Sequence, residues 1–156
     1  MFNTCKSLQG GIIFENILNT LFDKATNTSY MFAYCSKFNF TESSTLQLGE
    51  NVKIASNMFL FNTELTCLPT NFFYKCQSNL TDISNLFLGC TKLEKLKTPF
   101  NLSSTMNKIT NIDRVYYDCQ QLQIKEAINS FPVMPKCTKA FATFYKVSTK
   151  YDSSTI

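Results

Sequence analysis

The chain has 156 residues, which is enough for one domain with a substantial apolar core. Its composition includes 15 Phe and 7 Tyr but no His, the side chain that most often acts as a general base in catalysis. The net charge of +4 is mild and spread along the sequence without a basic run, so we expect no binding to nucleic acid.

Apolar stretches along the chain are too short to cross a bilayer, so we expect no insertion into a membrane. The first apolar run, Gly11–Phe14, is also too short for the core of a secretion signal, and Glu15 and Asp23 interrupt the sequence that follows it. The N-terminal sequence therefore does not read as a signal peptide.

A short phrase recurs from the first residue onward: an aliphatic residue, an aromatic residue, two variable residues, a cysteine, two more residues and a hydrophobic residue. Self-similarity at intervals of 25 to 30 residues predicts a solenoid, in which each unit buries its apolar face against its neighbours. The copies begin at Met1, Met31, Met58, Leu86, Val115 and Ala140, and the cysteine positions are Cys5, Cys35, Asn62, Cys90, Cys119 and Phe144.

Met1 occupies the same repeat position as Met31 and Met58, so the chain opens inside a repeat unit. The end coils of a solenoid need a cover that shields their apolar faces from water. Two hypotheses follow: the coils belong to a longer array in one polypeptide, or another subunit covers the ends.

The unit from Leu65 to Leu93 preserves the repeat best and predicts the content of one coil. Leu65–Leu68 reads as a short strand that Pro69 ends, because proline gives no donor to a ladder. Asn71–Cys76 reads as one helical turn on the rim of the coil. The same assignment predicts strands at Leu8–Phe14, Phe38–Phe40, Leu93–Leu96 and Leu122–Ile124, and rim segments at Leu18–Phe22 and Ile128–Phe131.

A short helix is predicted after the rim segment. Thr81 or Asp82 is a suitable N-cap, and the apolar residues that follow fall on one helical face. We interpret these positions as core packing and not as a cofactor site, so no cofactor is expected. They are Ile83, Leu86, Phe87 and Cys90, at i, i+3, i+4 and i+7.

Seven cysteines leave at least one thiol unpaired. If the repeated cysteines lie on adjacent helices, they are roughly 10 Å apart, which is too far for a disulfide. We therefore expect a column of buried, reduced thiols, while one bridge among Cys67, Cys76 and Cys137 stays open. Without histidine or a Cys-x-x-Cys pair, no metal site is expected.

The sequence also lacks the constellations that enzymes use. A Ser–His or Cys–His pair is impossible without histidine, and the 11 acidic residues are scattered instead of paired. Gly10-Gly11 has no Lys-Ser/Thr behind it, so it is not a phosphate-binding loop. We expect the protein not to be an enzyme.

Residues 81–96, TDISNLFLGCTKLEKL, resemble the unit of BspA-like leucine-rich-repeat proteins. The resemblance covers residues 1–147 and implies an α/β fold: a right-handed leucine-rich-repeat solenoid of about five coils, with short parallel strands on one face and short helices on the other. Residues 148–156 are expected to form a polar tail. Members of the family are typically surface or secreted proteins of bacteria and some protozoa that act in adhesion, and related arrays occur in phage proteins.

The resemblance and the solenoid architecture together predict a recognition or adhesion module. It would bind a protein or glycan on a host or neighbouring cell, as the extracellular part of a longer surface protein. The alternative is a structural or scaffold subunit of a larger assembly such as a phage virion, located in the virion or inside a cell. The residues predicted to contact a partner are Thr66, Tyr74, Glu94, Lys95, Gln123 and Lys125, although Tyr74 could instead cap the core.

Overall fold

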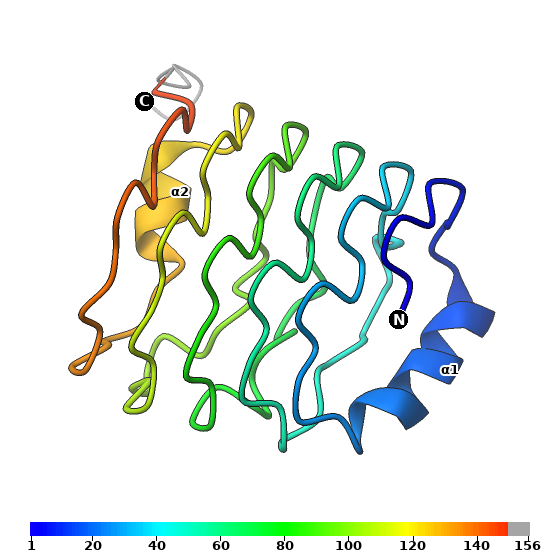
Figure 1. Cartoon of the computed structure of the whole chain (residues 1–156), viewed down its shortest axis with the longest axis horizontal. Coiled ribbons are helices and arrows are strands. Elements are labelled where there is room, and N and C mark those ends of the chain that lie inside the picture. The colour runs from blue at the N-terminus through cyan, green and yellow to red at the C-terminus, as the bar shows by residue number, and fades with distance from the viewer. Residues whose placement is uncertain (150–156) are drawn as a thin grey trace.

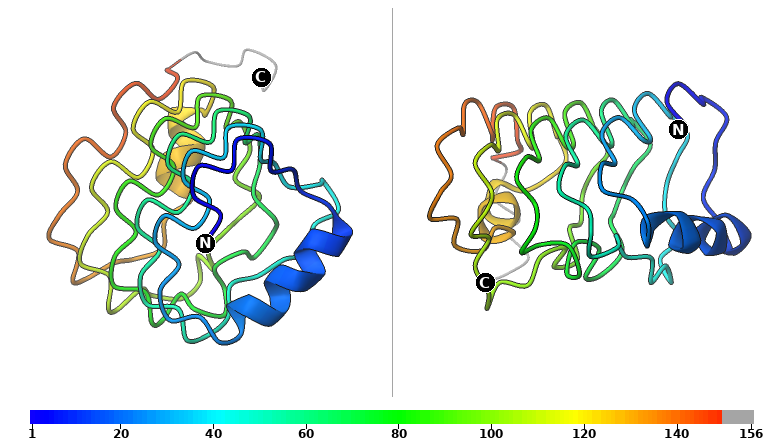
Figure 2. Two further views of the ribbon diagram at one scale, coloured as in Figure 1. Left: turned by 45° about the vertical axis from the view of Figure 1, so that its right-hand side comes forward. Right: turned by 60° about the horizontal axis from the view of Figure 1, so that its bottom comes forward.

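The computed structural model describes residues 1–149, which wind into a stack of coils (Figure 1). Helix α1, Ile12–Phe22, lies at one end of the stack, and helix α2, Ile124–Asn129, lies toward the other end (Figures 1 and 2). Most of the predicted polar tail falls at 150–156, outside the described residues. The assignment to a right-handed leucine-rich-repeat solenoid stays a prediction.

Adjacent coils pair through isolated parallel bridges, and residues 1–149 contain no longer strand. The strands predicted at Leu65–Leu68, Leu93–Leu96 and Leu122–Ile124 are each reduced to one bridged residue. The strand predicted at Leu8–Phe14 is wrong, because α1 begins at Ile12. The bridges are Asn27–Ile54, Ile54–Asp82, Asp82–Asn111, Asn111–Lys139, Cys67–Lys95, Thr105–Val133 and Gln123–Ser148.

The helices predicted within the repeated phrase are also wrong, because overlapping turns take their place. In the second copy the Cys35 N–H donates to the Phe32 carbonyl oxygen at 3.1 Å, which closes a turn of four residues. The N–H group of Phe32 itself does not bond within its own coil. It donates to the Met58 carbonyl oxygen of the next coil at 2.9 Å. Donors that a helix would satisfy internally are thus satisfied by the neighbouring coil, and no helix is needed.

Two residues in each of the five copies after the first have a left-handed backbone, with φ between 51° and 75°. They are four residues apart, and left-handed residues at this interval are incompatible with a continuous right-handed helix. The pairs are Tyr30 and Tyr34, Asn57 and Phe61, Asn85 and Gly89, Arg114 and Asp118, and Ala142 and Lys146.

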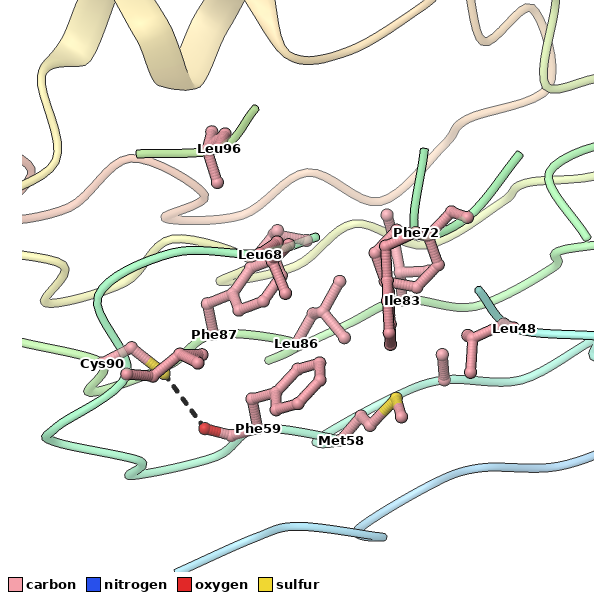
Figure 3. Packing of buried hydrophobic residues seen from close by; sticks show 14 of the residues in the cluster. Leu48, Met58, Phe59, Leu68, Phe72, Ile83, Leu86, Phe87, Cys90 and Leu96 are labelled. Carbon is pink, nitrogen blue, oxygen red and sulfur yellow. Dashed lines mark hydrogen bonds between the residues drawn. The ribbon is translucent and has the colours of Figure 1, made fainter. Parts of the chain in front are cut away.

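A ladder of stacked aromatic rings runs through the core along the whole stack. Successive ring centroids lie 5.5 to 6.3 Å apart, and neighbouring rings are within about 20° of parallel. Offset stacking of this kind adds about 0.5–1.5 kcal/mol per pair beyond the burial of apolar area. Figure 3 shows two of the rings, Phe59 and Phe87, within the buried cluster. The aromatic ladder consists of Phe2, Phe32, Phe59, Phe87, Tyr116 and Phe144.

The register of the ladder corrects the predicted last copy of the phrase. The repeat predicts Phe144 at the cysteine position, but its ring stacks on Tyr116 at 6.3 Å and so occupies the aromatic position. Val147 takes the cysteine position, since its N–H donates to the Phe144 carbonyl oxygen as that of Cys119 does to Tyr116. The misassignment arose because Phe141 also offers an aromatic residue three positions earlier.

All seven cysteines are free. The predicted separation of about 10 Å between repeated cysteines is wrong, because adjacent coils are joined by backbone hydrogen bonds and lie at the closer spacing of paired strands. Three thiols donate to the carbonyl oxygen of the ring residue in the preceding coil. These contacts are Cys35 to Phe2 at 2.9 Å, Cys90 to Phe59 at 3.0 Å (Figure 3) and Cys119 to Phe87 at 3.2 Å.

The rim segments differ among themselves. Leu18 and Phe22 belong to α1 and are fully buried, whereas Asn71–Cys76 forms turns and not the predicted helical turn. Gly49 lets the chain pass close to the end of α1, since a Cβ there would lie 2.2 Å from the Phe22 carbonyl oxygen. Of the last predicted rim segment, Ile128–Phe131, only the first two residues are helical, at the end of α2.

Candidate functional site

A polar groove of about 590 Å³ lies on the side of the stack, where α2 joins the preceding coil. It is open to solvent, and its lining is dominated by amide and carboxylate side chains. We call it the polar groove. Its lining residues are Glu94, Lys95, Gln120, Gln121, Gln123, Glu126 and Ser148.

One wall of the polar groove is the segment that contains Glu94 and Lys95. Both of their N–H groups donate to the Thr66 carbonyl oxygen of the preceding coil, at 2.9 and 3.2 Å. The flanking residues Leu93 and Leu96 are buried, so the apolar side chains point into the core and the two charged side chains are exposed. The local sequence therefore presents one anionic and one cationic group to the groove.

The opposite wall is the segment around Gln123, which bridges to Ser148 in the last coil. The Ile124 N–H donates to the Ser148 carbonyl oxygen at 3.0 Å, and the Ser148 N–H donates to the Leu122 carbonyl oxygen at 2.9 Å. Leu122 is fully buried and Gln123 is half-buried. Gln123 thus sits at the wall of the groove with its backbone fixed to the last coil.

Helix α2 creates the groove by interrupting the pairing of coils. No bridge joins Lys95 to Gln123, although bridges extend from both residues to their other neighbours, Cys67 and Ser148. The Glu126 carboxylate oxygen Oε1 instead accepts the Leu96 N–H at 2.7 Å. The Glu126 side chain of α2 therefore takes the place of a backbone carbonyl as the acceptor for the Leu96 N–H. The coil of Lys95 and the coil of Gln123 are not joined by a bridge at this point.

The polar groove gathers several side chains that can form hydrogen bonds. It brings together two carboxylates, Glu94 and Glu126, which the sequence places in different coils, together with one ammonium group at Lys95. The Glu126 carboxylate accepts the Leu96 N–H, and Glu94 is exposed to solvent. The three glutamines supply amide donors and acceptors.

Three of the six residues predicted to contact a partner line the groove: Glu94, Lys95 and Gln123. Thr66 lies behind this wall, and its hydroxyl oxygen is already occupied by the Asn39 amide at 2.9 Å.

The other two predicted residues lie apart from these three. Lys125 is exposed on α2 but is not part of the lining, and Tyr74 belongs to a different segment of the coil. The Tyr74 side chain is 37% exposed.

Sequence reasoning missed four lining residues: Gln120, Gln121, Glu126 and Ser148. Gln120 and Gln121 directly follow the cysteine of their phrase, where the repeat predicts only variable residues. Their adjacent, uncharged polar side chains were the available signal. The part played by Glu126 depends on α2, which no other coil among the described residues contains at this position.

Two further observations bear on function. Within the part of the chain that the structure describes, no group of three or more His, Cys, Asp or Glu side chains is placed to hold a metal ion. Neither α1 nor α2 is long and apolar enough to span a membrane.

Comparison with known proteins found no matching family model, no matching curated protein and no matching solved structure.

Proposed function

We propose that the protein is a non-enzymatic binding module that holds a polar segment of a protein or glycan partner in the polar groove. The observation that carries this proposal is the convergence of three amides, two carboxylates and an ammonium group in one solvent-filled groove of about 590 Å³. A concave site with a few fixed polar groups is the usual form of a specific binding site. Backbone hydrogen bonds to the neighbouring coils hold the two wall segments in place.

The resemblance to BspA-like proteins supports a partner on a host or neighbouring cell, with the module displayed at the cell surface within a longer protein. Each coil of a solenoid contributes a strip of side chains to one continuous surface, which suits adhesion. A scaffold subunit is the second candidate. The large apolar side chains exposed at both ends of the stack favour it, among them Ile13 and Phe141.

Binding to two printed arrays tests the proposal, one of oligosaccharides and one of peptides from extracellular proteins. We expect binding to members of at least one array, and we expect the double variant Lys95→Ala/Gln123→Ala to lose about tenfold or more in affinity. Lys125→Ala is the matched control, because Lys125 is exposed beside the groove without lining it. Equal binding by the double variant and the wild type would remove the groove from the proposal.

A further inference from the structure

Within residues 1–149, the last coil ends in backbone donors that have no partner. Along the stack, N–H groups of the phrase donate to the coil that follows: Tyr116 N–H to the Thr143 carbonyl oxygen at 3.0 Å, and Asp118 N–H to the Tyr145 carbonyl oxygen at 2.8 Å. The equivalent donors in the last coil are the N–H groups of Phe144 and Lys146. Among the described residues these two N–H groups have no hydrogen-bond partner.

The first coil ends in the matching acceptors. Phe2 N–H donates to the Met31 carbonyl oxygen at 2.9 Å, and Thr4 N–H donates to the Ala33 carbonyl oxygen at 2.8 Å. The carbonyl groups of the first coil that correspond to those acceptors belong to Met1 and Asn3. Within residues 1–149 no donor reaches either of them, so the two ends of the stack carry complementary backbone groups in the same register.

Both ends also expose large apolar side chains. At the first coil, Ile13 is 78% exposed and Ile17 54% exposed, and both line an apolar groove of about 450 Å³ together with Phe14. At the last coil, Phe141 is 67% exposed and Val133 66% exposed. Interior coils also expose apolar side chains, such as Tyr30 at 46% and Leu102 at 46%, but the most exposed large apolar side chains lie at the two ends. Exposed apolar patches are typical of interaction sites.

The aromatic ladder points to the occupant of these faces. Its terminal rings, Phe2 and Phe144, stack on one neighbour each, Phe32 and Tyr116, whereas the interior rings are stacked on both sides. An added coil would satisfy the last coil if it placed an aromatic ring on Phe144 and offered carbonyl acceptors at the positions of Met1 and Asn3. The first coil of this chain is such a coil.

We propose that the chain associates end to end with a second copy of itself, so that the first coil of one copy continues the stack after the last coil of another. The Phe144 and Lys146 N–H groups of one copy would donate to the Met1 and Asn3 carbonyl oxygens of the next, and Phe144 would stack on Phe2. This inference goes beyond the proposed function and does not depend on the polar groove. Because the two faces differ, the contact is heterologous, and because each copy continues the stack in the same direction, the array extends without closing.

Sedimentation velocity of the chain over a concentration range of about 5 to about 200 µM tests the proposal. We expect the weight-average sedimentation coefficient to rise steadily with concentration, without a plateau at the dimer. A monomer at every concentration would overturn the proposal and would indicate that these faces take a different occupant.

Two single variants make the test specific to the ends. Ile13→Glu blocks the first face and Phe141→Glu blocks the last, so each variant alone should remain monomeric. Their equimolar mixture retains one compatible pair of faces and should form dimers and nothing larger. Leu102→Glu is the control, since Leu102 is 46% exposed in a middle coil and its substitution should leave association intact. A mixture that stays monomeric, or an equal loss in the control, would contradict the end-to-end contact.

Discussion

Asn62 places a buried amide in the column of cysteines. Its Oδ1 accepts the Cys35 N–H at 3.0 Å, but its Nδ2 is buried without a hydrogen-bond partner. An unsatisfied buried donor costs about 1–3 kcal/mol, because it has lost water and gained nothing in return. The sequence showed that this residue departs from the repeat, but it could not show the unpaired amide nitrogen.

Replacing the amide with the thiol of the other copies should therefore stabilise the protein. Asn62→Cys removes the unpaired donor and places a thiol where it can donate to the Phe32 carbonyl oxygen, so we expect the free energy of unfolding to rise by about 1–2 kcal/mol. Urea denaturation under reducing conditions measures this change. The converse variant, Cys90→Asn, should be destabilised, and an Asn62→Cys protein less stable than the wild type would contradict the account.

Buried thiols should make the fold sensitive to alkaline pH. Burial raises the pKa of Cys76 from its ordinary value of 9.0 to about 12, and burial also raises the pKa values of Cys90 and Cys119. The unfolded chain releases these protons at lower pH than the folded protein does. Their contribution to stability is therefore complete below pH 9 and is lost as pH rises from 9 toward 12.

Urea denaturation with a reducing agent at several pH values between about 7 and about 11 measures this loss. We expect stability to decline above pH 9, and we expect Cys76→Ala to reduce the slope by up to about 1.4 kcal/mol per pH unit. An unchanged slope in Cys76→Ala would show that this thiol ionises equally easily in the folded protein.

At the scale of the element, the turns in each copy depend on left-handed residues. Gly89 has φ of 75°, and a Cβ at this position would lie 2.3 Å from Cδ1 of the Phe61 ring. Other copies place side chains such as Phe61 and Asp118 in the same conformation, so the backbone alone does not require glycine. Gly89 differs from these positions because the Phe61 ring of the preceding coil lies directly against it.

Gly89→Ala should therefore destabilise the protein by about 1–2 kcal/mol, through the left-handed backbone and the displaced ring together. In a Phe61→Ala background the ring is absent, and the cost of Gly89→Ala should fall to about 1 kcal/mol. Urea denaturation of the four proteins in this double-mutant cycle separates the two contributions. Additive effects would show that Phe61 and Gly89 do not interact.

The predicted helices show where sequence reasoning reached its limit. Ile83, Leu86, Phe87 and Cys90 are all fully buried, as their spacing predicted. The same spacing arises from successive turns of three to four residues, so periodicity identified the buried residues but not their backbone conformation. Only the partners of the N–H groups separate the two, and for alternate residues those partners lie in another coil.

At the scale of the whole molecule, the repeat length predicted which segments lie side by side, because residues about 28 positions apart pair along the stack. The polar groove was only partly predictable. Glu94, Lys95 and Gln123 follow from the alternation of buried and exposed residues in their segments. The groove itself results from α2 and the Glu126 carboxylate, which depart from the repeat and therefore could not be derived from it.

The stack of coils supports both proposals, and its central feature is that alternate N–H groups of each phrase bond to the next coil. Scalar couplings across hydrogen bonds, measured by NMR, detect such pairs directly. We predict couplings from the Phe59 N–H to the Leu86 carbonyl carbon and from the Phe87 N–H to the Val115 carbonyl carbon, where the N···O distances are 3.0 and 2.9 Å. A coupling from the Phe87 N–H to the Ile83 carbonyl carbon, four residues earlier, would instead demonstrate a helix and contradict this arrangement.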